Sequence, residues 1–123
     1  MGTFIRFGFL VALVAAIIWH AGAARGAGAL AVGQCGSYGH AYDYPDAAAA
    51  LRAARAKCHG TCTAVTMNHA CAAFAVDMTN PCGSFGYAVA PQIKSALNTS
   101  MRNCYKFCGH ECVIRTWACD AKG

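Results

Sequence analysis

The chain reads Cys-Gly-Ser-Tyr-Gly at residues 35–39 and Cys-Gly-Ser-Phe-Gly at residues 82–86. The likeness extends to both sides of this motif. Upstream, Ala-Leu-Ala-Val at residues 29–32 is matched by Ala-Phe-Ala-Val at residues 73–76, and downstream each motif is followed by a proline, an Ala-Leu pair and a cysteine. Self-similarity with a period of roughly 20–50 residues marks a repeated structural unit. The sequence therefore predicts an internal duplication.

The duplication predicts the same order of elements in both copies: strand, strand, helix, strand. Neither copy can bury its helix alone, so the two copies are expected to pack together. The predicted fold class is α+β, with two pseudo-symmetric strand-strand-helix-strand repeats packed as one disulfide-stabilised domain. Strands are expected at residues 28–32, 37–44, 61–68, 71–77, 84–90 and 111–119, and helices at residues 45–57 and 91–105.

Proline and leucine positions are matched between the two predicted helices. Pro45 and Pro91 are expected at the first helical position, where the missing N–H costs nothing. Asp46 then lies in the first turn, where a carboxylate suits the helix dipole. Leu51 and Leu97 are expected to face the sheet from equivalent places on alanine-rich helices.

Alternation with period two predicts which side chains share a face of each strand. In the second strand the alternate positions carry rings, which form one predicted face: Tyr38, His40, Tyr42 and Tyr44. In the last strand one predicted face carries Val113, Arg115 and Trp117, and the other carries Ile114, Thr116 and Ala118.

The first 27 residues resemble a secretory signal peptide and short leader. An apolar run at residues 7–19 follows Arg6, and small residues come after it, with an Ala-x-Ala site at residues 21–23 and a second possible cleavage point after Ala27. Thirteen apolar residues are short for a membrane span, so an uncleaved anchor is the weaker alternative. The mature domain is predicted at residues 28–123, with its two repeats at residues 28–71 and 72–120.

Nine cysteines in an exported chain predict structural disulfides. A domain of about 100 residues that is rich in Ala and Gly buries little apolar area, and each disulfide contributes about 2–4 kcal/mol. The duplication favours Cys58–Cys62 and Cys104–Cys112, because each would join a helix end to the start of the next strand. The other expected half-cystines pair among themselves in an order that the sequence leaves open: Cys35, Cys71, Cys82 and Cys119.

Cys108 has no counterpart in the other copy, so it is the candidate free thiol. Two alternatives to structural disulfides remain open. Soft ligands lie close together at Cys108, His110 and Cys112, and a metal could bind there. A redox role would depend on Cys108, since no Cys-x-x-Cys motif occurs in the chain.

These motifs resemble those of the domain of unknown function 4189 family. The resemblance rests on the leader, the Ala-x-Ala-Val strand, the Gly-x-Tyr/Phe-Gly motif and the Cys-Ala-Ala-Phe-Ala-Val junction at residues 71–76, and it covers roughly residues 28–120. Membership would imply a secreted bacterial protein with a duplicated, disulfide-braced fold. It would bring neither an established activity nor catalytic residues. Three cysteines look like additions to the family pattern: Cys35, Cys82 and Cys108.

The remaining sequence features favour binding over catalysis. The formal net charge is +5, but the basic residues are scattered, whereas a nucleic-acid groove needs denser Lys/Arg with interleaved aromatics. No nucleophile-elbow, zinc-protease or phosphate-loop motif is present. We therefore expect no catalytic residues, no cofactor, no bound metal, no nucleic-acid partner and no stable membrane insertion after signal cleavage. The predicted function is a secreted or periplasmic, non-enzymatic interaction module, in its narrower form an inhibitor or effector that binds a protein partner. The alternative is a thiol-redox or metal-binding protein.

Overall fold

The computed structural model describes residues 26–107 and 109–120. The predicted signal segment and Cys108 therefore lie outside the described residues, except for Gly26 and Ala27. The elements follow one another as β1 (Ala27–Val32), the 3-10 turn η1 (Gln34–Gly36), β2 (Tyr38–Tyr44), α2 (Ala47–Lys57), β3 (Thr63–Met67), β4 (Cys71–Asp77), β5 (Phe85–Ala90), α3 (Ile93–Lys106) and β6 (Cys112–Cys119).

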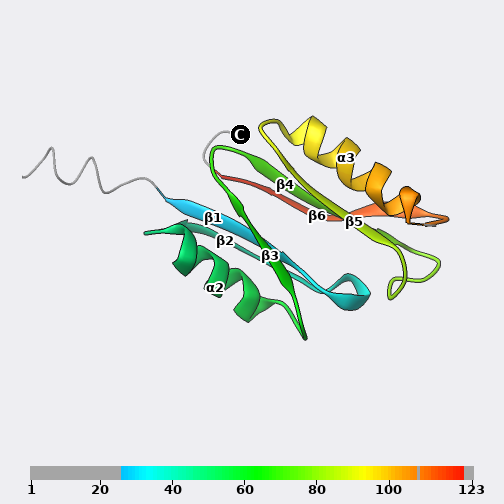
Figure 1. The fold of residues 1–123 in the computed structure, drawn as a ribbon, viewed down its shortest axis with the longest axis horizontal. Helices are drawn as coiled ribbons and strands as arrows, with labels where there is room; N and C mark the ends of the chain where they lie inside the picture. Colours follow the sequence, from blue (N-terminus) through cyan, green and yellow to red (C-terminus); the bar gives the residue numbers. More distant parts are fainter. Residues whose placement is uncertain (1–25, 108, 121–123) are drawn as a thin grey trace, which may run out of the picture.

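The strands form two antiparallel sheets of three strands each, ordered β2-β1-β3 and β5-β4-β6. The sheets lie face to face, and each carries its own helix on the outer side, α2 on one and α3 on the other (Figure 1). The predicted α+β class with two strand-strand-helix-strand repeats is thus confirmed. The central strands are β1 and β4, the first strand of each copy.

Large and small apolar residues alternate along the central strands, and this alternation builds the layers. In β1, Leu30 and Val32 face the opposite sheet, while Ala29 and Ala31 face α2. In β4, Phe74 enters the core between the sheets and every residue of the strand is buried. Bulky side chains therefore fill the space between the sheets, and alanines let each helix lie close to its sheet.

The second glycine of the repeated motif is required by this close helix packing. A β-carbon on Gly39 would collide with the backbone carbonyl oxygen of Ala54 in α2. A β-carbon on Gly86 would collide with the corresponding oxygen of Ser100 in α3. The same contact in both copies explains why a glycine recurs there.

The four-ring face predicted on β2 is wrong at its last member. The register changes between the pairs Ala29–Ala41 and Ala27–Tyr44, so β2 has an extra residue at this point, and Asp43 has a positive φ of 57°. A β-bulge of this kind turns the following side chain to the other face. Tyr44 therefore packs against the core beneath α2. The other rings remain neighbours on the face toward the second sheet: Tyr38, His40 and Tyr42.

A second bulge corrects the predicted faces of β6. Phe74 pairs with Thr116, but the next residue of β4, Ala75, pairs with Ile114, so Arg115 is the extra residue. Ile114 consequently packs beneath α3. Thr116 and Ala118 lie on the opposite face of the sheet, so Ile114 does not share their face as strict alternation predicted.

Both helices begin later than predicted. Asp46 is the N-cap of α2, with an extended backbone, and its Oδ1 accepts a hydrogen bond of 2.8 Å from the Ala49 amide. Aspartate is among the best N-cap residues, so it caps the helix from outside and Pro45 precedes the helix. In the second copy Gln92 is the N-cap, and Pro91 likewise lies before α3.

The matched leucines lie at the margin of each helix–sheet contact. Leu51 packs against the cluster beneath α2 and Leu97 against the cluster beneath α3, and both are half-buried. Smaller residues occupy the centre of each contact and are fully buried: Ala50 and Ala54 in α2, Ala96 and Ser100 in α3.

Four disulfides connect the described residues: Cys35–Cys82, Cys58–Cys62, Cys71–Cys119 and Cys104–Cys112. Two of them join a helix end to the next strand in equivalent places, as the duplication favours. Cys71–Cys119 links β4 to β6 within the second sheet. Residue 71 therefore lies in the second sheet, although the sequence assigned it to the first repeat. Cys35–Cys82 is the bond that joins the two copies.

Candidate binding groove

The edges of the two sheets differ in how well they are protected from pairing with another chain. Bulges, charged side chains and short length all discourage such pairing. The β2 edge has the bulge at Asp43, and Lys57 Nζ donates a 2.9 Å hydrogen bond to its His40 carbonyl. The β6 edge has the bulge at Arg115, and β3 has only five residues.

The β5 edge has fewer of these protections. Its six residues, Phe-Gly-Tyr-Ala-Val-Ala, carry no charge and pair with β4 in unbroken register. The amide of Asp77 donates to the Ser84 carbonyl at 3.1 Å, so the backbone groups of Ser84 point toward β4. In an antiparallel ladder alternate residues direct both backbone groups to the same side. The backbone groups that point away from β4 are therefore those of Phe85, Tyr87 and Val89.

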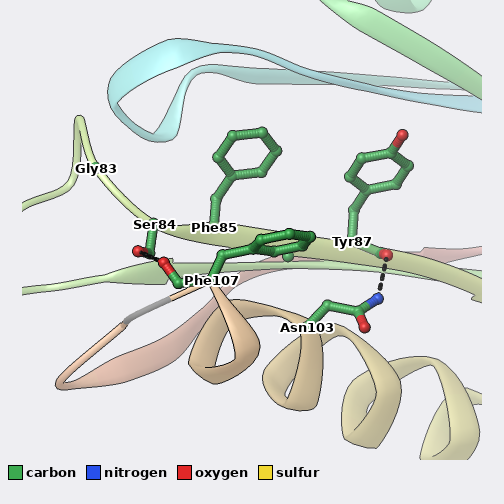
Figure 2. Close-up of a pocket in the computed structure, with 7 residues that line it drawn as sticks. Gly83, Ser84, Phe85, Tyr87, Asn103 and Phe107 are labelled. Carbon is green, nitrogen blue, oxygen red and sulfur yellow. Dashed lines mark hydrogen bonds between the residues drawn. The ribbon is translucent and has the colours of Figure 1, made fainter.

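A groove of about 830 Å³ runs beside this edge, and we call it the β5 groove. Phe85 and Tyr87 project from one side of β5, and Phe107 extends along the strand from the end of α3 (Figure 2). Phe85 is 42% exposed and Phe107 is 64% exposed, which is unusual for side chains of this size. The full lining is Gly83, Ser84, Phe85, Gly86, Tyr87, Asn103 and Phe107.

Contacts with the core hold the aromatic wall of the groove in place. Phe85 meets the buried Phe74 edge to face, with ring centroids 6.1 Å apart. It also stacks on Tyr87 at 6.5 Å with an angle of 12° between the rings. Aromatic pairs favour both arrangements. The ring of Phe85 is thus fixed from below while its outer part remains exposed.

Polar contacts tie α3 to the strand on the other side of the groove. Asn103 Nδ2 donates to the Tyr87 carbonyl at 3.4 Å, and Ser84 Oγ donates to the carbonyl of Phe107 (Figure 2). The Asn103 contact matches the one that Lys57 makes in the first copy, but an amide takes the place of the ammonium group. The edge carbonyl in the second copy therefore has a longer and uncharged hydrogen bond.

A buried carboxylate holds the residues that lead into β6. Asp77 is 3% exposed and stands where the first copy has Gly33. Its carboxylate accepts hydrogen bonds from Thr79 Oγ1 at 2.7 Å, from the Thr79 amide at 2.9 Å, and from the His110 and Glu111 amides at 3.2 Å. The hydrogen bond from the Thr79 hydroxyl lowers the pKa of Asp77 most, and the backbone hydrogen bonds lower it further. Together they hold this pKa at about 2, although burial acts to raise it. Asp77 is therefore ionised at neutral pH and anchors residues 110 and 111, just ahead of β6.

The charge beside the groove is positive. The charged residues of α3 are all basic and exposed: Lys94, Arg102 and Lys106. Arg102 and Lys106 are four apart, so they share one side of α3, and each is the sequence neighbour of a groove residue, Asn103 or Phe107. Of the five acidic residues in the chain, Asp77 and Asp120 are buried.

The residues that the sequence offered as a metal or redox site have other roles where the structure describes them. Cys112 is bonded to Cys104, so its sulfur is not a thiolate ligand. His110 contributes its backbone amide to Asp77, and Cys108 lies outside the described residues. Over residues 26–107 and 109–120, no group of three or more His, Cys, Asp or Glu side chains is placed to hold a metal ion.

His40 occupies the aromatic position that the alternation predicted. Its ring lies 5.6 Å from that of Tyr38 and 5.3 Å from that of Tyr42. Burial lowers the pKa of His40, and the Lys57 cation lowers it further. At neutral pH the ring is therefore uncharged and acts as an aromatic side chain, as Tyr87 does at the equivalent place.

Sequence reasoning did not identify the β5 groove. Two signals pointed to it: an uncharged strand with aromatic residues at alternate positions, and extra residues between helix and strand in the second copy alone. Phe107 lies in that longer connection. Phe107 lines the groove, so the longer connection supplies an aromatic side chain beside β5.

The fold and the groove together define a small, duplicated, disulfide-braced α+β domain with an exposed aromatic edge. The family model described as Domain of unknown function (DUF4189) matches residues 27–119, and the chain belongs to this family. Neither a curated protein nor a solved structure matches the chain. In the described part of the chain no helix is long and apolar enough to cross a membrane.

Proposed function

We propose that this domain is an exported, non-enzymatic interaction module that binds a protein partner in the β5 groove. The observation that carries the proposal is the placement of two exposed phenylalanines, Phe85 and Phe107, beside a strand edge that has few protections against pairing. Exposed aromatic residues that cluster in a concave surface are typical of binding sites for proteins and peptides.

The chemistry of the groove supports binding rather than catalysis. The described residues that line it offer aromatic rings, the hydroxyls of Ser84 and Tyr87, the amide of Asn103 and backbone groups. General acid–base catalysis most often uses a histidine or a carboxylate within reach of the substrate, and the described lining contains neither. The thiol or metal alternative has less support, because Cys112 is already bonded to Cys104.

The cysteines and the leader support export. Four disulfides in a domain of this size are typical of proteins that fold in an oxidising compartment. The predicted signal peptide at residues 1–27 agrees with this. These features support a secreted or periplasmic location as part of the proposal. An inhibitor or effector that acts on another protein is its narrower form.

A peptide-display selection tests the proposed site. The disulfide-bonded protein, purified from the exporting host, is used to select binders from a library of random linear peptides. Selected peptides are then titrated against Phe107→Ser and Phe85→Ser. The matched control is Trp117→Ser, because Trp117 is an exposed aromatic residue (55%) on the far edge of the same sheet.

The expected result is a loss of affinity of about tenfold or more in each groove variant, since a central aromatic contact is commonly worth more than 1 kcal/mol. The Trp117 variant should bind like the wild type. Selected peptides that bind all three variants with wild-type affinity would overturn the β5 groove as the binding site.

A further inference from the structure

We infer that the β5 groove takes its partner as an added β-strand: an extended segment that alternates apolar with acidic residues and pairs with the β5 edge. This inference rests on the proposed function and specifies the partner's conformation and charge.

The backbone of β5 is available for this pairing. Phe85, Tyr87 and Val89 direct their amide and carbonyl groups away from β4, and a partner of five or six residues would span them. At this edge the structure shows one side-chain contact, from Asn103 to the Tyr87 carbonyl at 3.4 Å. Common N–H···O hydrogen bonds measure about 2.9–3.0 Å, so a backbone amide of the partner can replace this long contact at small cost.

Side chains along the edge specify an alternating partner. A strand added to β5 would set every second residue opposite Phe85, Tyr87 and Val89, on the face that carries the aromatic wall. Its other residues would lie opposite Gly86 and Ala88, on the face of the sheet against which α3 packs. The first set should therefore be apolar, and the second set should suit the surface of α3.

The surface of α3 selects acidic residues for that second set. Arg102 and Lys106 flank Asn103 and Phe107 along the helix, and α3 carries no acidic residue. Opposite charges across an interface speed association and exclude wrong partners. A second copy of this chain fits poorly, because β5 carries no acid and a β5–β5 pair would bring two basic helices to one side.

Designed peptides test the pairing and the charge preference separately. The probe is a capped seven-residue peptide of alternating Glu and Val. One comparison peptide has Lys in place of every Glu, and another is the Glu-Val peptide with N-methyl groups on the amides that would pair with β5. Binding is measured by calorimetry at low and physiological salt.

The Glu-Val peptide should bind, and its affinity should fall as salt is added. The Lys-Val and N-methylated peptides should each bind at least about tenfold more weakly. The double variant Arg102→Glu/Lys106→Glu should reverse the preference between the Glu and Lys peptides. The matched control, Arg52→Glu/Arg55→Glu on α2, changes the net charge equally and should keep the wild-type preference.

Each other outcome overturns a defined part of the inference. Equal binding of the N-methylated peptide would exclude strand addition, and equal binding of the Lys-Val peptide would exclude the acidic preference. If display-selected peptides need Phe85 and Phe107 but the Glu-Val peptide does not bind, the inference fails and the proposed function stands. A concentration-dependent dimer that Phe85→Ser abolishes would identify a second copy as the occupant instead.

Discussion

Replacing Gly86 by alanine tests the packing on which both the fold and the groove depend. The new β-carbon would collide with the Ser100 carbonyl and would lie 2.5 Å from the backbone nitrogen of Cys104. Ordinary contacts between non-bonded heavy atoms are about 3.5–4.0 Å, so α3 would have to move by about 1 Å. The obstructing atoms are backbone atoms, so a change of side-chain rotamer cannot relieve the collision.

The free energy of unfolding should fall by about 1–3 kcal/mol, the range for overpacking a well-filled contact. For a domain of roughly 100 residues, each kcal/mol corresponds to about 4–8 °C in Tm, so the expected decrease is about 5–20 °C. Thermal unfolding of the oxidised protein, followed by circular dichroism, measures it. Because α3 carries Asn103 and Phe107 directly follows it, the variant should also bind groove peptides more weakly.

Two further substitutions show whether the reasoning about Gly86 is right. Gly39→Ala should cost about as much, because its β-carbon meets α2 in the same way. Gly60→Ala is the control: Gly60 has a φ of +79° with no atom within 4 Å, so only backbone strain of about 1–2 kcal/mol applies. A Gly86→Ala protein that melts with the wild type, or a neutral Gly39→Ala beside a costly Gly86→Ala, would refute the matched helix contacts.

The remaining predictions concern acid stability, the helix margins and the N-terminus. Asp77 has a folded pKa of about 2, below the unfolded value of about 3.9, so its contribution to the free energy of unfolding is present above pH 4 and is lost as the pH falls toward 2. Asp77→Asn should therefore flatten acid unfolding curves in this window, and unchanged curves would contradict the assignment. Leu51→Ala and Leu97→Ala should each cost about 1–2 kcal/mol in urea unfolding, less than a fully buried leucine because both are half-buried, and clearly unequal costs would argue against their equivalence. N-terminal sequencing of exported protein should find a start near Ala24, because cleavage after Ala27 would remove the first residue of β1; a mature chain that retains residues 7–19 would instead be a signal-anchored protein.

The alternation of residue types predicted most of the fold, and it failed where the backbone departs from regular geometry. The alternation of β-branched and aromatic residues predicted the strands, and the alanine-rich segments predicted the helices. The repeat predicted their order. Tyr44 and Ile114 were assigned to the wrong faces because the bulges at Asp43 and Arg115 depend on pairing between strands, which one strand's pattern does not encode. The helix starts were misplaced because both Pro45 and Asp46 suit a helix beginning, and the cap geometry decides between them.

The groove was harder to predict because it depends on exposure. Phe85 and Tyr38 occupy matched places in the motif, yet Arg115 covers Tyr38 with its guanidinium carbon 5.2 Å from the ring centre, while Phe85 is left exposed. This difference in exposure depends on the strand of the other copy that lies opposite each ring. Sequence periodicity carries no information about this neighbour.

The Cys35–Cys82 bond also decides what happens if the chain is cut between its two copies. Asn68 and His69 form an exposed bend between β3 and β4, the kind of site where proteases act first. A cut there would place Cys35 on one fragment and Cys82 on the other, so the fragments would remain covalently joined. The tether keeps the two sheets at high effective concentration, which favours their continued packing. Where extracellular proteases are abundant, a nicked molecule can thus persist as a folded two-chain protein.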